Sequence, residues 1–420
     1  MASFLAYIFI FIVSYILYKA YRDRKIGGLF NPIVFFCIYY TYYIIYPFFT
    51  SESDIYGALK YDGRELLLIG AILSILSMYA AFNIYKPRKT LGSNYMYLGA
   101  NSMKLGLWLS IIGILSYFVI NGFSINVLAI QNDFYDATQH RLGHAEEYIS
   151  LLVSLLPAAA CLLYAASSKW IYIVVVSLFA TVIGLMDGSR YLIFMYYIPL
   201  IVFYHIYPNP KKVNLKIWVP TALFFILAMG VIEKTRNYGS GLDIEKLNDI
   251  FSDKSANVKA TETEGVYYFS SKVMDAYQNE PLLYGDVFGT ALCLPIPRSL
   301  FPEKPDAKYL VDANIRVLGS SSIGAAYLNI VEWYIALGWI GIILNGVLLG
   351  ILSKFFWCNY IKSQRSIGGA MYLAIFDGLG YILVSRGYLA QEYVMFVYYL
   401  PMIYWISSLV LTFSTRKKTA

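Results

Sequence analysis

The stretch that decides how the chain is interpreted runs from Leu294 to Trp339 and has the sequence LPIPRSLFPEKPDAKYLVDANIRVLGSSSIGAAYLNIVEWYIALGW. Prolines fall at four of its first twelve positions, where they remove backbone donors and prevent a continuous helix. Cationic side chains follow, then a Gly/Ser-rich turn, and then Glu332 at the start of a long apolar run. We therefore expect a polar segment that meets water and lies between segments of a different kind.

The composition of the whole chain identifies those other segments. Of 420 residues, 59% are hydrophobic and 14% are charged, whereas a soluble domain has about 25% charged residues. Tyrosine and phenylalanine are abundant, with 41 and 26 residues, as is usual where aromatic rings lie at lipid–water interfaces. The sequence therefore predicts an all-α polytopic membrane protein. Its net charge is +7. In a soluble protein this charge might indicate nucleic-acid binding, but in a membrane protein basic residues first reflect which side of the membrane each loop faces. We therefore expect no nucleic acid as a partner.

Apolar runs long enough to cross a bilayer recur along the chain. A spanning helix needs about 20 residues, and this length predicts eleven spans. They cover residues 2–18, 30–50, 65–84, 103–121, 148–165, 170–186, 191–207, 216–233, 325–352, 366–385 and 393–412. No internal repeat is visible, which argues against transporters built from inverted repeats.

The distribution of lysine and arginine predicts the orientation of these spans. With the N-terminus outside and the C-terminus cytoplasmic, the inner loops hold most of the basic residues, as the positive-inside rule requires. The first span is expected to stay uncleaved, because its basic cluster follows the apolar run. The chain then divides into residues 1–233 with eight spans and a shorter outer loop at 121–147, a large extracytoplasmic loop at 234–324, and residues 325–420 with three spans and a tail.

Two parts of the large loop carry apolar side chains. Residues 265–279 have apolar residues at helical spacing, so we expect a helix that lies on the membrane or on the bundle. Residues 282–297 are apolar but interrupted by glycines, so we expect them to dip into the outer interface.

Arginines on the outer side oppose the positive-inside rule and need another explanation. They are Arg141, Arg190, Arg236, Arg298, Arg316 and Arg386. A guanidinium group binds phosphate oxygens through two parallel hydrogen bonds and stays charged. A lipid diphosphate in the outer leaflet would supply the explanation, and we expect two or three of the six arginines to contact it. Arg190 has a second interpretation, an ion pair with Asp187 that closes the hairpin between two spans.

Two groups on the predicted outer side are the candidates to take up a proton. Glu332 is either a general base or an interface carboxylate paired to an arginine. His144 follows His140 by four residues in the shorter outer loop. This loop is either a solvated amphipathic helix or a lid or part of a sugar site. No cysteine or second carboxylate constellation supports this histidine pair, so we expect no metal.

Three short motifs give the chain a resemblance to a known family. They are GSR at 188–190, PRSLFPEKP at 297–305 and EWYIALGWIG at 332–341. Together with many spans and a large outer loop in the C-terminal half, they resemble the Wzy-type polymerases of O-antigen and capsule repeat units. The resemblance implies a GT-C-like helical bundle, a location in the bacterial cytoplasmic membrane and a chain-length-regulating co-polymerase of the Wzz type as a partner.

The resemblance also implies a reaction without a cofactor. The donor is a growing glycan on undecaprenyl diphosphate, and the acceptor is one repeat unit on the same carrier in the lipid bilayer. Cationic side chains stabilise the charge that develops on the diphosphate. The expected diphosphate ligands are Arg190, Arg298 and Arg386, with Arg236 and Arg316 in reserve. Glu332 is the first choice of general base and His144 the second.

Two other functions stay open. A ligase of the same broad architecture would move glycan from the lipid carrier to a different acceptor. A flippase or other transporter of lipid-linked oligosaccharide would place its cations in a central cavity with short loops, whereas the predicted cations lie in a long outer loop and at outer span ends.

Overall fold

The chain divides into two compact units of mostly helical structure. The computed structural model describes residues 1–50, 63–87, 102–120, 151–166, 170–186, 190–208, 236–237, 241–242, 262–294, 296, 300–305, 308–318, 326–363, 366–389 and 393. The first unit comprises Met1–Thr90, Lys259–Asn359 and Leu379–Val397, and the second comprises Leu91–Val258, Tyr360–Gly378 and Tyr398–Ala420.

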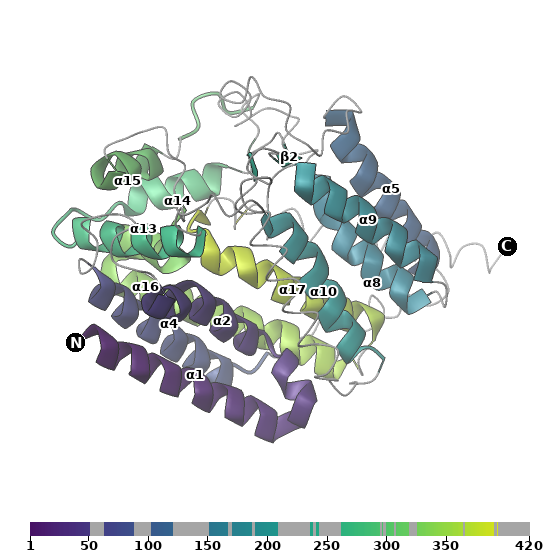
Figure 1. Ribbon diagram of the computed structural model, residues 1–420, viewed down its shortest axis with the longest axis horizontal. Helices are drawn as coiled ribbons and strands as arrows, with labels where there is room; N and C mark the ends of the chain where they lie inside the picture. Colours follow the sequence, from purple (N-terminus) through teal and green to yellow (C-terminus); the bar gives the residue numbers. More distant parts are fainter. Residues whose placement is uncertain are drawn as a thin grey trace, which may run out of the picture. The chain divides into compact units, whose positions relative to one another are not determined.

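The first unit combines N-terminal helices with helices from the second half of the chain (Figure 1). The N-terminal elements are α1 (Ala2–Arg24), η1 (Lys25–Phe30), α2 (Pro32–Tyr40), η2 (Thr41–Ile45), α3 (Tyr46–Thr50) and α4 (Arg64–Ile84). The later elements are α13 (Glu262–Ala276), α14 (Tyr284–Cys293), α15 (Lys308–Leu318) and α16 (Asn329–Lys362) up to Asn359. In the described residues, the last helix is α17 (Ile367–Ser385). It is divided, and its residues from Leu379 onward belong to this unit.

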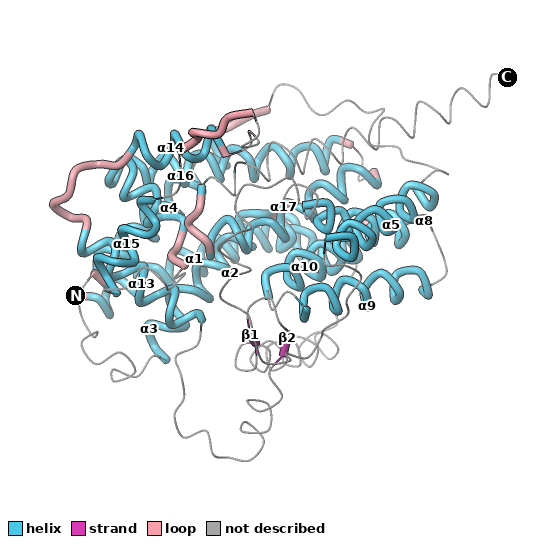
Figure 2. The backbone as a smooth tube through the Cα atoms, turned by 90° about the horizontal axis from the view of Figure 1, so that it is seen from above, coloured by secondary structure: helices cyan, strands magenta, loops and turns pink. Residues whose placement is uncertain are grey.

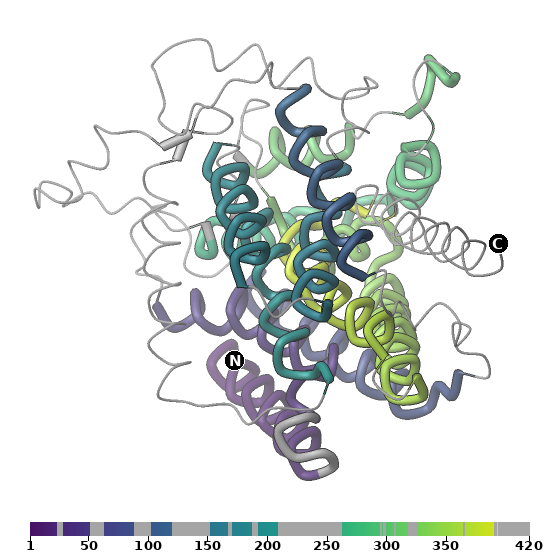
Figure 3. The backbone as a smooth tube through the Cα atoms, turned by 90° about the vertical axis from the view of Figure 1, so that its right-hand side faces the viewer, coloured from purple at the N-terminus to yellow at the C-terminus, as the bar shows by residue number. Residues whose placement is uncertain are grey.

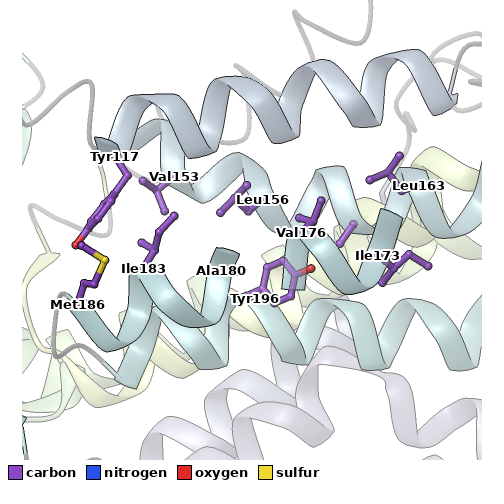
Figure 4. Packing of buried hydrophobic residues seen from close by; sticks show 11 residues of the cluster. Tyr117, Val153, Leu156, Leu163, Ile173, Val176, Ala180, Ile183, Met186 and Tyr196 are labelled. Atoms are coloured by element: carbon purple, nitrogen blue, oxygen red, sulfur yellow. The ribbon is translucent and has the colours of Figure 1, made fainter. Parts of the chain in front are cut away.

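In the second unit, apolar helices pack along one another around α8. Its elements are α5 (Ser102–Ile120), η5 (Leu151–Leu155), α8 (Leu156–Ala166), α9 (Trp170–Met186), α10 (Arg190–Ile206), residues 367–378 of α17 and the two-residue strands β1 (Arg236–Asn237) and β2 (Gly241–Leu242). α8 contacts α5, α9 and α10 (Figure 3). A Cβ on Gly106 or Gly113 of α5 would lie 2.9 Å from a leucine side chain of α8, so these glycines allow close packing. The buried cluster in Figure 4 fills the space between the helices.

The structure confirms a polytopic, helical membrane protein. Six described helices are long and apolar enough to cross a membrane: Ala2–Arg22, Pro32–Thr50, Arg64–Ile84, Ser102–Val119, Asn329–Lys362 and Ile367–Ser385. Shorter apolar helices cover Leu152–Ala166, Trp170–Met186 and Leu192–Ile206. The predicted span 216–233 and all but the first residue of 393–412 lie outside the described residues. The number of eleven spans therefore stays a prediction.

The bounds of one predicted span need correction. The sequence predicts a span over 325–352, whereas α16 begins at Asn329, ends at Lys362 and is broken at Gly338, with φ 65° and ψ −147°. This conformation is readily available only to glycine. The break separates a short helix that contains Glu332 from residues 339–362, which measure ~36 Å at 1.5 Å per residue. Lys354, predicted to lie beyond the span, is instead helical, with Nζ 4.5 Å from the ring centre of Phe82.

The described helices of the predicted large loop are α13, α14 and α15, which lie beside α16 in the first unit (Figures 1 and 2). The strands β1 and β2 also fall within residues 234–324, but they belong to the second unit. α13 contacts α4, η2 and α3, so the expected helix of residues 265–279 lies on the bundle. α14 leaves Tyr284 and Leu292 exposed by 63% and 60%. These exposed apolar side chains are compatible with the expectation that this segment meets the interface.

Gly63 permits the contact between α4 and α13. It has a φ of 74°, and an added Cβ would lie 1.8 Å from the carbonyl oxygen of Ser271. We expect Gly63→Ala to destabilise the protein by about 3 kcal/mol or more, because left-handed strain and a backbone clash act together. Thermal unfolding in detergent measures the loss.

Gly265→Ala is the matched control, since no atom lies within 4 Å of its added Cβ and alanine favours α13. This control should leave the unfolding midpoint unchanged or higher. Equal midpoints for the two variants would contradict the assigned role of Gly63.

Candidate functional site

A buried carboxylate joins three separate segments of the first unit. Glu332, in the first turn of α16, is 1% exposed. The Tyr309 hydroxyl of α15 donates a hydrogen bond to its Oε1. The backbone N–H of Leu389, beyond the end of α17, donates to its Oε2 at 2.5 Å. We call these three residues the Glu332 node.

The Glu332 node lies in apolar surroundings. Tyr309 belongs to a buried cluster with Val287 of α14 and Ala336 of α16, and Leu389 packs against this cluster. The start of α14 is fixed to α16 by a hydrogen bond from the N–H of Leu283 to the carbonyl oxygen of Ile335 at 3.0 Å. An ionised carboxylate in such a place is tolerated only when donors satisfy its oxygens, and the Glu332 node supplies one donor to each oxygen.

The hydroxyl of Tyr309 stays protonated in this environment. Burial raises its pKa far above the usual value, and the nearby charge of Glu332 raises it further. A tyrosine with a raised pKa acts as a hydrogen-bond donor over the whole working pH range. Tyr309 is therefore a fixed donor to the carboxylate.

The segment that follows α17 is held by backbone contacts as well. The N–H of Gly387 donates to the carbonyl oxygen of Tyr327 at 2.6 Å, and the N–H of Tyr388 donates to the carbonyl oxygen of Arg386 at 2.9 Å. A Cβ on Gly387 would lie 2.7 Å from the Tyr327 ring and 2.8 Å from the carbonyl oxygen of Leu328. Only glycine allows this approach without displacement of the neighbouring segment.

The segment Tyr327–Leu328 is in turn fixed to α13. The Leu328 N–H donates to the Ser270 hydroxyl at 2.9 Å, and the rings of Phe269 and Tyr327 lie 5.7 Å apart. Polar contacts thus connect α13, the start of α16, α15 and the segment after α17. Arg386, at the start of that last segment, is partly buried.

Arg316, which the sequence places in reserve for diphosphate, forms an ion pair with Glu280. Its guanidinium also lies 5.1 Å from the ring centre of Tyr277. The hydrogen bond from Arg316 to Glu280 raises the pKa of this exposed arginine. A phosphate would have to compete with Glu280 for the same guanidinium.

The other predicted site residues are placed only in part or not at all. Arg190 is the first residue of α10, and Arg236 pairs with Leu242 between β1 and β2. Both belong to the second unit, and their side chains are outside the described structure. Arg298 and His144 also lie outside the described residues. Within the first unit, the structure therefore places Glu332 and Arg386 on two segments that share a hydrogen bond.

The comparison with protein families decides the identity of the chain. The family model described as O-antigen polysaccharide polymerase Wzy matches residues 1–419. The chain belongs to this family. It is thus a polysaccharide polymerase of O-antigen synthesis and a multi-pass membrane protein that acts on lipid-linked oligosaccharide. Comparison with curated proteins found no match, and comparison with solved structures found none either.

Two residues of this Wzy-family chain were not assigned a role from the sequence. Tyr309 was missed, although its spacing from Ala313 marks one buried face of α15. Lys304 was noted only as a cation, yet its Nζ donates to the carbonyl oxygens of Leu294 and Ile296 at 3.3 and 3.1 Å. These carbonyl groups follow the end of α14, where a cation is favourable.

In the part that the structure describes, no group of three or more His, Cys, Asp or Glu side chains is arranged to hold a metal.

Two tyrosines near Glu332 provide a test of the node. Tyr309→Phe removes a donor to a buried carboxylate, which we expect to cost about 1.5–3 kcal/mol of stability. Tyr327→Phe is the matched control, because the buried Tyr327 hydroxyl makes no hydrogen bond within the described residues. The control should leave the thermal unfolding midpoint in detergent unchanged or higher. Equal midpoints for the two variants would show that the Tyr309 hydroxyl does not stabilise the carboxylate.

Proposed function

We propose that the protein polymerises undecaprenyl-diphosphate-linked oligosaccharide repeat units into O-antigen or capsular polysaccharide at the outer face of the bacterial cytoplasmic membrane. The observation that carries this proposal is the family match over residues 1–419. A helical membrane protein with polar segments between its apolar helices suits a substrate that has a lipid part and a sugar part.

The proposed reaction transfers the growing glycan to a single repeat unit. A hydroxyl oxygen of the acceptor sugar attacks the anomeric carbon of the donor, and a glycosidic C–O bond forms. The bond between the anomeric carbon and the diphosphate oxygen breaks, and undecaprenyl diphosphate leaves with the electron pair. The hydroxyl proton passes to a base. Because diphosphate is a good leaving group, the main contribution required of the protein is to orient both substrates and stabilise the developing negative charge.

The proposed ligands of the diphosphate are arginines. Arg386 has the strongest structural support, since its segment is fixed next to a polar node of the first unit. Arg190 and Arg298 complete the proposed set, and Arg236 and Arg316 stay in reserve. For Arg316, competition from Glu280 makes a direct role less favourable.

The base is proposed from the two candidates that the sequence offers. Glu332 already accepts hydrogen bonds from Tyr309 and Leu389 and is 1% exposed, so its contacts favour a supporting role. His144 is the group to which we assign the proton.

The proposed orientation follows from the basic residues of the sequence. The N-terminus lies outside, the C-terminus lies in the cytoplasm, and the segment from 234 to 324 faces the side on which the lipid-linked units are joined. The positive-inside rule supports this arrangement. A Wzz-type co-polymerase is the proposed partner that regulates chain length.

Purified protein with a lipid-linked repeat unit as the only substrate tests the proposal. We expect a ladder of products that differ by one repeat unit. Arg386→Ala should lower the rate of extension by about 10²–10³-fold, the loss typical when a group that stabilises transition-state charge is removed. Gel separation of the lipid-linked glycans measures both results.

Lys308→Ala is the matched control, because Lys308 is an exposed cation at the start of α15. It should extend glycans like the unmodified protein. Transfer of one glycan to a different acceptor, without a ladder, would indicate a ligase. Precursor that accumulates on the inner leaflet of a deletion strain would indicate a flippase. Either outcome would refute the proposed polymerisation.

A further inference from the structure

Glu332 lies where a carboxylate can shape a site without touching the substrate. A general base must reach the proton that it removes, directly or through one water. The side chain of Glu332 is 1% exposed, and protein donors approach both of its oxygens. We propose that Glu332 is a positioning residue which, together with Tyr309, holds the segment Arg386–Leu389 so that Arg386 meets the lipid diphosphate. This inference rests on the proposed function.

The path from Glu332 to Arg386 is short and consists of backbone. Glu332 holds the N–H of Leu389 at 2.5 Å, and Leu389 is three residues from Arg386. Three extended residues span at most ~11 Å, and the turn from Arg386 to Tyr388 is closed by a hydrogen bond of 2.9 Å. The N–H of Arg386 is held by the carbonyl oxygen of Ile382 at 3.1 Å, so the contact at Leu389 fixes the course of the chain on the other side of Arg386.

A second anchor fixes the same segment from the other side. The N–H of Gly387 donates to the carbonyl oxygen of Tyr327 at 2.6 Å. Gly387 lies in the chain between Arg386, which is to be positioned, and Leu389, which Glu332 holds. Two anchors within three residues define both the location and the rotation of the segment. A displacement of about 1 Å at a reacting centre can cost 10²-fold in rate, so the loss of one anchor is enough to affect catalysis.

Tyr309 fixes the carboxylate that fixes the segment. Its hydroxyl donates to the oxygen of Glu332 that does not contact Leu389. Without this donor, the carboxylate can rotate and the bond to Leu389 is no longer held in one geometry. α15 is thereby coupled to Arg386 through a single side chain of α16.

A glutamine at position 332 separates a positioning role from a general base. In Glu332→Gln, the amide oxygen still accepts from the Leu389 N–H, and the amide nitrogen donates to the Tyr309 hydroxyl, which can turn to accept. Both contacts are retained, whereas the ability to take up a proton is lost. We expect this variant to extend glycans within about threefold of the unmodified rate, with the same dependence on pH.

An alanine at position 332 removes both contacts. We expect Glu332→Ala to lower the extension rate by about 10²-fold. Because Glu332 acts through Arg386, the same change should cost less than about threefold when Arg386→Ala is already present. The measurement is the initial rate of extension of a purified lipid-linked repeat unit by each single and double variant.

Tyr40→Phe serves as the matched control for general damage to the start of α16. Its hydroxyl donates to Oδ1 of Asn329 at 3.0 Å and lies 3.3 Å from the hydroxyl oxygen of Ser74 on α4. The effect of this control, whatever its size, should be the same with and without Arg386→Ala. If Glu332→Ala does not accumulate as folded protein, Tyr309→Phe replaces it in the double-variant comparison.

Two results would overturn the inference. Loss of extension in Glu332→Gln, with a normal unfolding midpoint, would identify Glu332 as the base. In the double variant, the loss in extension rate from Glu332→Ala, or from its substitute Tyr309→Phe, could multiply with the loss from Arg386→Ala. This result would show that the node does not act through Arg386. Failure of the proposed function is a separate result, because the unmodified protein would then give no ladder from the lipid-linked repeat unit.

Discussion

The need to satisfy one buried carboxylate organises the described part of the first unit. Glu332 lies among apolar side chains, where an unpaired charge would be very costly. Its two donors come from residues 23 and 57 positions away in the chain. The carboxylate is satisfied only if α15 and the segment after α17 both reach the start of α16. A local requirement for hydrogen bonds thus specifies how three distant segments meet.

Glycines make these meetings possible at the level of the backbone. Gly63 lets α4 approach α13, Gly338 breaks α16 after the turn that contains Glu332, and Gly387 lets the last segment approach Tyr327. A side chain at Gly63 or Gly387 would collide with the neighbouring segment, and Gly338 has a φ that L residues rarely adopt. The polar node and the close backbone approaches therefore support each other.

The sequence predicted the helical membrane architecture but not the contacts of the site. Hydropathy and length are local properties, so the spans near 2–18, 65–84 and 366–385 were correctly located. The break at Gly338 was missed, since a glycine within an apolar run is also tolerated in a continuous helix. Glu332 was singled out because it lies at the start of a long apolar run. Its partners Tyr309 and Leu389 could not be found, because one is an ordinary tyrosine on α15 and the other contributes only its backbone.

Two carboxylates in the first unit illustrate different ways to stabilise a segment that carries an arginine. Glu280 bonds the guanidinium of Arg316 itself, so any phosphate must displace a carboxylate of the same charge. Glu332 bonds the backbone of Leu389, so what it fixes is the course of the chain that carries Arg386. Fixing the backbone beside Arg386 orders the segment that carries this cation. For a reaction in which negative charge develops on a leaving group, pre-ordered cations are the most effective contribution a protein can make, and the backbone contacts of Leu389 and Gly387 give the segment of Arg386 such order.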